Sequence, residues 1–488
     1  MPSRPQIGPL AAAALALSLG GLAACAPDLG PASKIRPASD YAVARTFKAT
    51  ATDWPAANWW TVYNDPQLTG LIEQALKTSP DLKAVQARLF KARARAEQAG
   101  AGLGPNLTAK GSVQETGVKL NFPNTPSQFN SFLPNDPQPF TQVSANLSYQ
   151  LDFFGRNHAA LAAAASEAQA QAYEEAAARL QLSTAVAIAY ADLMKASADE
   201  AAAQSDVELR AKSTGLVRDR LKNGLENVAS FSQAFASQAT SDGDLIAAKG
   251  AELEARFALA ALVGLGPDSM LALKPTEGLQ ITPVGLPANL GANLIGRRPD
   301  VAAARLRVEA AARLEKVARA DFYPNVNMAG SLMLLSMTPQ ELLSHNLQLA
   351  QVGPAVSLPL FDSGRLSGAL RGARGDYEEA VANYDKTVAT ALREVADAIT
   401  IRKGAQESVE KAEGALKAWE KGYEVARLRY GAGLITYLNV MTTEDALVDA
   451  RRRVADLKAQ SLGADVSLTR ALGGGFVDPT APVTHSNP

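Results

Sequence analysis

The chain repeats itself, and this duplication constrains its fold more than any other feature. Several residues of an early segment recur later at one fixed offset in residue number. Pro80-Asp81, Arg88, Pro105-Asn106 and Gly111 correspond to Pro299-Asp300, Arg307, Pro324-Asn325 and Gly330. A further set matches at a slightly smaller offset: Val143, Leu147, Leu151 and Gly155-Arg156 against Val352, Val356, Leu360 and Gly364-Arg365. Separated prolines in register rarely arise by chance, so the sequence predicts two copies of one unit.

The order of patterns is the same in both copies: a short helix, a medium helix, a strand, a loop, a strand and two long helices joined by a tight turn. The expected segments are a signal peptide (1–24), a lipid-anchored N-terminal segment (25–64), repeat 1 (65–270), a linker (271–285), repeat 2 (286–475) and a disordered tail (476–488). Strands are expected at about 106–117, 141–153, 325–337 and 350–361, and helical hairpins at 156–264 and 365–472.

The strand patterns alternate between apolar and polar residues. From Val143 to Phe153 every second residue is apolar, which predicts a strand with one apolar and one polar face. About ten residues is the length of a strand in a membrane β-barrel. Four such strands cannot close a barrel, so a membrane role requires several chains to pool their strands. A half-buried sheet in a soluble protein would give the same alternation.

Two long segments, 156–221 and 365–429, contain no proline and are rich in helix-forming residues. Each would extend roughly 100 Å as one helix, too long for an ordinary domain core, so the helices must pack side by side as in coiled coils. Glycines at Gly224 and at Gly431 and Gly433 predict the turns that end them.

The single cysteine, Cys25, follows a basic end, an apolar core and small residues, the pattern of a bacterial lipoprotein signal. The apolar core is too short for a membrane span, so we expect cleavage before Cys25 and its acylation, which would hold the mature chain at a bilayer. With no second cysteine the mature chain forms no internal disulfide. No transmembrane helix is expected after residue 25.

Composition and motifs do not favour a nucleic-acid-binding protein or an enzyme. The 48 basic and 49 acidic residues balance, which does not favour nucleic-acid binding. Three scattered histidines, His158, His345 and His485, form no metal-ligand spacing, and no phosphate loop or nucleophile elbow is present. We therefore expect no enzyme, no cofactor and no metal site.

Several motifs together resemble a known family, the TolC and NodT-type outer-membrane efflux lipoproteins of the outer membrane factor group. The motifs are Trp59-Trp60, Asp65-Pro66-Gln67-Leu68, Pro80-Asp81-Leu82, Asp152-Phe153-Phe154-Gly155-Arg156, Arg297-Arg298-Pro299-Asp300, Phe361-Asp362-Ser363-Gly364-Arg365 and Ala471-Leu472-Gly473-Gly474-Gly475. The resemblance covers nearly the whole mature chain.

This resemblance implies a mixed architecture, all-α plus a membrane β-barrel: a homotrimer whose twelve-stranded barrel in the outer membrane continues as a periplasmic helical barrel. It implies a passive exit duct for small molecules, delivered by an inner-membrane pump through a periplasmic adaptor. It also implies adaptor contacts at the hairpin tips, Gly224, Leu225, Gly431, Gly433 and Leu434.

A pore constriction is expected close to these tips. Relatives often carry acidic residues there, whereas this chain offers Ser230, Asn439 and Thr442, so a carboxylate ring would fall to Glu444 or Asp445. Three like charges close together would repel and respond to pH or cations. A solvated helix face would explain the same acidic residues equally well.

The alternative function is a lipid-anchored periplasmic scaffold of helices without a pore. It would use the same long helices but would not require alternating strands. For the duct, the loops at about 118–140 and 338–348 would face the cell exterior. The substrate is not indicated by the sequence.

Overall fold

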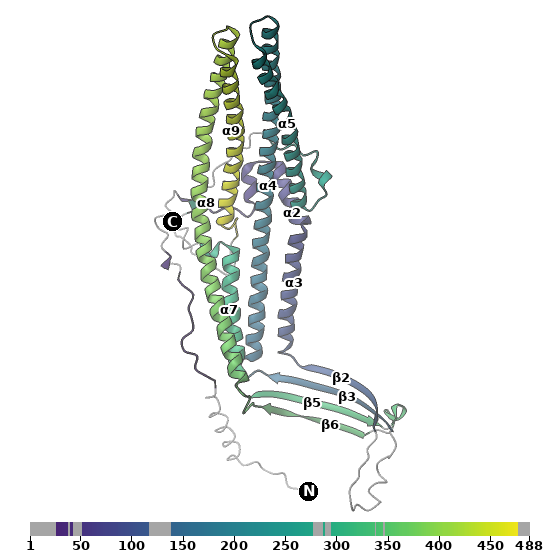
Figure 1. Ribbon diagram of the computed structural model, residues 1–488. Helices are drawn as coiled ribbons and strands as arrows, with labels where there is room; N and C mark the ends of the chain where they lie inside the picture. Colours follow the sequence, from purple (N-terminus) through teal and green to yellow (C-terminus); the bar gives the residue numbers. More distant parts are fainter. Residues whose placement is uncertain are drawn as a thin grey trace, which may run out of the picture. The chain divides into compact units, whose positions relative to one another are not determined.

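The computed structural model describes residues 26–37, 40–41, 51–116, 138–276, 286–287, 294–336, 338–344 and 347–476 (Figure 1). The expected signal peptide, Cys25, most of the loop at 118–140 and nearly all of the tail at 476–488 lie outside these residues. Across the part of the chain just defined, none of the helices combines the length and the apolar character needed to cross a membrane.

The chain forms two compact units, and neither is one of the sequence repeats. The first combines 90–169 with 306–382 and the described residues up to Lys34. The second combines the remaining described residues, within 35–89, 170–305 and 383–488. Each unit therefore takes parts of both repeats, and four helices contribute residues to both units: α3 (Pro80–Ala101), α4 (Arg156–Lys222), α7 (Pro299–Ala320) and α8 (Arg365–Gly431).

The first unit contains an antiparallel sheet of four strands in the order β2-β3-β5-β6. The strands are β2 (Asn106–Thr116), β3 (Gln138–Leu151), β5 (Asn325–Ser336) and β6 (Leu347–Ser357). The register places Leu147 opposite Leu107 and Gly330, and Gly330 opposite Val352. Because side chains alternate along a strand, these positions share one face of the sheet, and most residues on that face are apolar.

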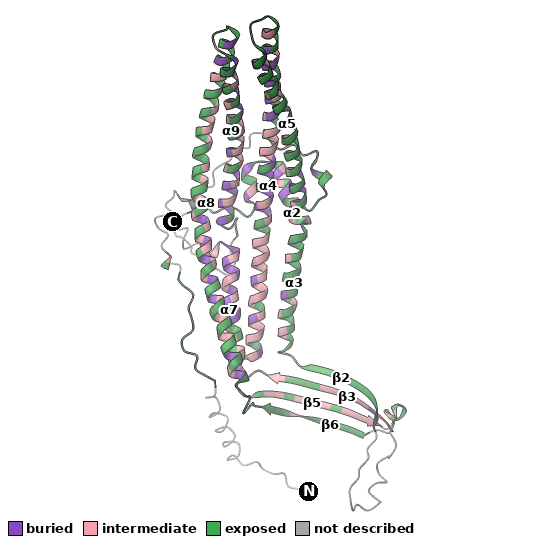
Figure 2. Cartoon of the chain, viewed as in Figure 1, coloured by how far each residue is buried: buried purple, intermediate pink, exposed green. Residues whose placement is uncertain are grey.

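The two edge strands of this sheet are exposed. Figure 2 shows β2 and β6 mostly in the colour of exposed residues, and nearly every residue of β6 is exposed. In the described chain each edge strand has a neighbour on one side alone. The strand β6 ends at Ser357, earlier than the expected 361, because Pro359 has no N–H to donate to a ladder.

The second unit packs the two long hairpins against a short helix, α2 (Pro66–Thr78). The hairpins pair α4 with α5 (Val228–Val263) and α8 with α9 (Tyr437–Ala471). The largest core cluster includes residues that are fully buried: Leu68, Ile72, Tyr190, Leu259 and Val466.

Polar contacts fix the start of α2 in this core. Asp65 caps the helix by accepting hydrogen bonds from the backbone N–H groups of Gln67 and Leu68, at 2.7 and 3.1 Å. Its second oxygen accepts a hydrogen bond of 2.8 Å from the Tyr190 hydroxyl. The Asp65-Pro66 motif is therefore a buried helix start that joins α2 to α4.

The second copy departs from the first before its medium helix. Where the first copy has α2, the described residues of the second have only the single turn η6 (Leu294–Gly296). A two-stranded parallel sheet, β1 (Ala51–Thr52) with β4 (Leu286–Pro287), is a feature that the sequence patterns did not predict.

Candidate functional site

Two glycines shape the turns at the hairpin ends. Gly224 and Gly433 have φ of +69° and +75°, in the left-handed region that favours glycine. At each turn the next residue closes the helix: Leu225 N–H donates to the Arg220 carbonyl and Leu434 N–H to the Arg429 carbonyl, both at 2.9 Å. Gly431 has no positive φ and is instead the last residue of α8.

Both turns present an apolar side chain to solvent. Leu225 is 65% exposed and Leu434 is 72% exposed. Val228 and Leu438, at the starts of α5 and α9, are exposed as well, and exposed large apolar side chains grouped in this way commonly mark a surface that another molecule covers. Leu225 and Leu434 are therefore the hairpin-end positions best suited to contact a partner protein.

Just behind the turns, the two hairpins pack against each other through an aromatic cluster. We call it the tip cluster, and its buried members are Val217, Ala234, Tyr430, Tyr437 and Val440. The Arg220 guanidinium lies 4.7 Å from the centre of the Tyr430 ring, and the Tyr430 hydroxyl donates a 2.9 Å hydrogen bond to Glu226. Burial raises the pKa of Tyr437 to about 12, so this hydroxyl stays protonated at neutral pH.

The two acidic residues expected near the pore, Glu444 and Asp445, both contact one arginine. Glu444 of α9 is 0% exposed, and its Oε1 lies 3.4 Å from the Arg210 Nε of α4. The Ser213 hydroxyl donates a 2.9 Å hydrogen bond to the other Glu444 oxygen. Arg210 also contacts Asp206, at 3.3 Å, and Asp445. We call these five residues the Arg210 network.

Burial governs the protonation of this network. It raises the pKa of the Glu444 carboxyl above its usual range, although Arg210 and Ser213 act in the opposite sense. Burial likewise raises the pKa of Asp206. Glu444 thus faces α4 within the protein, whereas Asp445 keeps about half of its side chain exposed.

The other three candidates for a constriction make local contacts. Ser230 donates its backbone N–H to the Asn227 side chain, which caps α5. Asn439 accepts a 2.8 Å hydrogen bond from the Thr436 hydroxyl, and Thr442 donates to the Leu438 carbonyl at 3.1 Å. The structure therefore joins Glu444 and Asp445 through Arg210 but does not bring Ser230, Asn439 and Thr442 into the same network.

The sequence reasoning missed Arg210 and Asp206. Their spacing of four residues places them on one face of α4, which is a weak signal because such pairs are common on solvated helices. The informative fact is their burial, which only the packing of α9 on α4 provides.

Cys25 lies outside the described residues, but the segment that follows it contacts α8 in the first unit. The Tyr377 hydroxyl donates a 2.9 Å hydrogen bond to the Ser33 carbonyl, and Arg374 donates to the Gly30 carbonyl at 3.4 Å. These bonds hold the chain downstream of the expected lipid anchor against a long helix.

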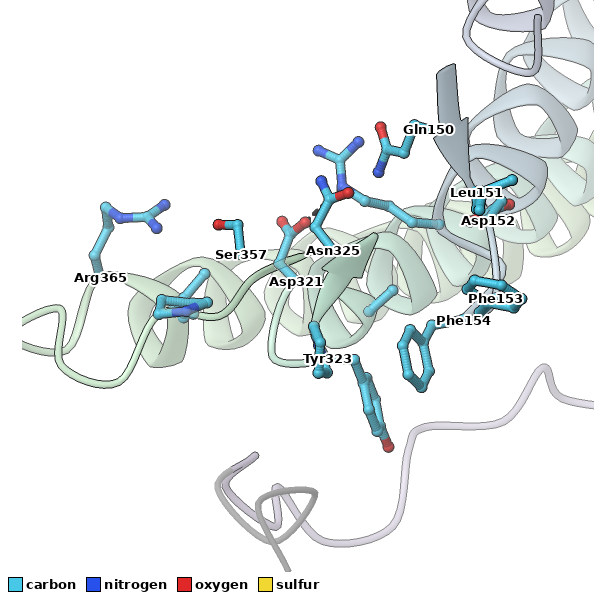
Figure 3. Close-up of a pocket in the computed structure, with 15 residues that line it drawn as sticks. Gln150, Leu151, Asp152, Phe153, Phe154, Asp321, Tyr323, Asn325, Ser357 and Arg365 are labelled. Atoms are coloured by element: carbon cyan, nitrogen blue, oxygen red, sulfur yellow. Dashed lines mark hydrogen bonds and ion pairs between the residues drawn. The ribbon is translucent and has the colours of Figure 1, made fainter. Parts of the chain in front are cut away.

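A small cavity of about 270 Å³ lies where the strands meet the helices in the first unit (Figure 3). Arg156 at the start of α4 pairs with Asp321 at 2.5 Å. The Phe154 and Tyr323 rings stack with centres 4.7 Å apart, and Figure 3 shows Arg365 apart from the other labelled residues. This junction fastens the strand-to-helix turn of the first repeat, between β3 and α4, to the helix-to-strand turn of the second repeat, between α7 and β5.

In the described part of the chain, no group of three or more His, Cys, Asp or Glu side chains is placed to hold a metal ion. His158 contacts Asp152 at 2.6 Å, and His345 and His485 lie outside the described residues.

Comparison with known proteins gives consistent matches over most of the chain. The profile of the family described as "Outer membrane efflux protein" matches residues 71–265 and 290–474. The chain is 25% identical over 423 residues to the probable outer membrane lipoprotein SilC of Salmonella typhimurium, covering 86% of this chain and 88% of SilC.

Two further relatives are more similar in sequence. The multidrug resistance outer membrane protein MdtQ of Escherichia coli O6:H1 is 30% identical over 476 residues, covering 93% of this chain and 96% of MdtQ. The solved structure of the outer membrane protein VceC of Vibrio cholerae superposes with a TM-score of 0.78 at 37% identity, covering 87% of this chain and all of VceC.

Proposed function

The chain belongs to the outer membrane efflux protein family, and from this membership we propose that three copies form one passive duct through the outer membrane. It is an outer-membrane channel of an efflux system, extending into the periplasm. Members of this family are transporters rather than enzymes, and they work with pumps and adaptors.

The four-stranded sheet is the observation that supports a barrel shared between chains. Its apolar face suits lipid, yet the backbone groups along the open edges of β2 and β6 would cost several kcal/mol each in a bilayer. Pairing β6 of one copy with β2 of the next would satisfy these groups. Three copies would then supply twelve strands, a number within the range of closed membrane barrels.

The long helices would continue the duct on the periplasmic side. A helix of 67 residues, the length of both α4 and α8, is about 100 Å long, far more than a bilayer requires. Twelve helices from three copies would enclose a tube without chemistry of its own. An acylated Cys25 would add a lipid anchor beside the barrel.

The hairpin ends would meet a periplasmic adaptor. Leu225 and Leu434 support this because both are apolar and exposed although they follow rigid, glycine-closed turns. An adaptor that covers them would gain the free energy of removing their apolar surface from water. The Arg210 network would hold α9 against α4 when the duct is closed, and opening would separate these helices.

Charged substitutions at the hairpin ends test this assignment. Leu225→Glu and Leu434→Glu should reduce export of a fluorescent drug by about tenfold or more in cells that lack the native protein, because charge opposes burial against an adaptor. Ile246→Glu is the matched control, since Ile246 of α5 is 73% exposed but is not at a turn. The same loss of export with Ile246→Glu, or loss of the trimer in all three variants, would contradict a contact specific to the tips.

A further inference from the structure

The polar face of the four-stranded sheet changes character along its length. Near the helices it carries small and polar side chains, such as Asn106, Asn146, Asn327, Ser331 and Gln351. Near the loop that joins β5 to β6 the same face carries large apolar side chains. We call these the hairpin-end strip: Phe140, Met333, Leu335, Leu347 and Leu349.

Strand register defines the strip. Leu335 pairs with Leu347 and Met333 pairs with Leu349, so these four side chains occupy adjacent positions on neighbouring strands. Leu347 is 61% exposed and Leu349 is 51% exposed. Since the opposite face of these strands is also apolar, for example at Leu332 and Leu334, β5 is apolar on both faces near its end.

Such a strip is unexpected on the inner wall of a channel. The interior of a membrane barrel is normally polar because it holds water. A strand that is apolar on both faces usually has apolar material on both sides. Lipid would cover one face of β5, whereas the strip would border the lumen.

One cationic residue lies in the same row as the strip. Lys110 of β2 is opposite Ser144, Ser144 is opposite Met333, and Met333 is opposite Leu349. Over the four described strands, Lys110 is the one charged residue on this face. Neighbouring strands lie about 4.8 Å apart, so two strand spacings, about 10 Å, separate the backbones of Lys110 and Met333.

We propose that the hairpin-end strip and Lys110 together form a binding site for amphiphilic organic anions in transit through the duct. The apolar body of the molecule would lie on Met333, Leu335, Leu347 and Leu349, and its anionic group would lie at Lys110. This inference rests on the proposed function, because the face lines a lumen only when three copies close a barrel. Binding at such a site must be weak, since a permeating molecule has to leave again.

Three probes separate the apolar from the electrostatic part of this recognition: naphthalene-2-sulfonate, 2-naphthylmethylammonium and methanesulfonate. The first two share an apolar body but differ in charge, and the first and third share the sulfonate. In single-channel recordings of the purified trimer, naphthalene-2-sulfonate should halve the current at a concentration about tenfold below that of the other two.

Substitutions then assign the effect to the strip. Leu347→Ser with Leu349→Ser should raise the half-blocking concentration of naphthalene-2-sulfonate about tenfold and leave that of methanesulfonate unchanged. Lys110→Gln should remove the difference between naphthalene-2-sulfonate and 2-naphthylmethylammonium, and it tests the site separately if the leucine variant does not assemble. Gln351→Ser is the control on the same face of β6.

The outcomes distinguish the site from the duct. Normal conductance with equal block by all three probes, or with unchanged block in the variants, would overturn the binding site and leave the duct intact. A parent protein that is monomeric and gives no discrete conductance would overturn the duct, and the site with it.

Discussion

At the scale of single residues, Arg210 joins the two hairpins near their ends. It contacts Asp206 on its own helix and Glu444 and Asp445 on α9. Removing one partner of a buried ion pair leaves a charge without compensation, which costs far more than the pair itself contributes. The network therefore makes separation of α9 from α4 sensitive to substitution and to pH.

Substituting Glu444 tests this role. Glu444→Ala should destabilise the packed hairpins by about 3 kcal/mol, the lower end for removing one buried partner, because Asp206 and Asp445 remain beside Arg210. Glu444→Gln keeps the shape and the contact with Ser213 and should cost less. Open-channel probability should rise in the alanine variant. Equal behaviour of both variants and the parent would contradict the role.

The pH dependence has a definite sign. The pKa of Glu444 is raised by burial above its ordinary value of 4.5, so the packed state binds this proton more tightly than a solvated state does. Packing at this site is therefore most stable below that ordinary value and loses stability as the pH rises through the raised one. Open probability of the parent should therefore increase as the pH is raised from acidic to neutral, and Glu444→Gln should flatten the profile.

The turn glycines Gly431 and Gly433 differ in backbone conformation, and one alanine variant at each position tests whether this difference matters. An alanine at Gly433 must adopt a positive φ, which costs about 1 kcal/mol, whereas Gly431 is helical and accepts alanine. A Cβ atom added at either position would have no neighbouring atom within 4 Å, so a difference between the two variants would not come from steric clashes. Gly433→Ala should lower export more than Gly431→Ala at equal trimer level. The reverse order would contradict a role for the turn's geometry.

At the scale of the elements, the positions of the strands and helices could be predicted from the sequence better than the contacts between them. The alternation from Val143 to Phe153 and the proline-free segments are local signals, and β3, α4 and α8 lie where these signals are. The burial of Glu444 is not local, because it depends on Arg210, more than two hundred residues away. Likewise the sequence repeats were visible, but the compact units mix both repeats because strands and helices of the two copies pack together.

A disulfide between elements tests whether the hairpins move apart. The Ser237 hydroxyl of α5 lies 3.7 Å from the Met441 sulfur of α9. In a Ser237→Cys, Met441→Cys protein, oxidation should link these helices and lower conductance, and reduction should restore it. The one native cysteine, Cys25, is expected to be acylated and would not compete. Each single variant is a control. Undiminished conductance in the fully oxidised protein would show that opening does not separate α5 from α9.

At the scale of the whole molecule, we propose that the chain is one third of a functional object. The exposed edges of β2 and β6, the long hairpins and the apolar tips are all features that association with other chains would complete. We expect lipidation at Cys25 to be independent of that closure, because strand pairing alone would satisfy the backbone in the membrane.

Cys25→Ser separates the anchor from the barrel. The variant should lose its acyl chains but still form trimers, since strand pairing does not involve the lipid. Mass spectrometry of the purified protein measures the acylation, and gel mobility without boiling measures the trimer. A variant that never reaches the outer membrane would instead make the lipid a requirement for sorting.

The most direct test of the duct is the single-channel conductance of the purified mature protein in a planar bilayer, with its mass in detergent measured on the same sample. We expect a trimer that gives discrete conductance steps. A monomer without conductance would contradict the shared barrel and favour the periplasmic scaffold.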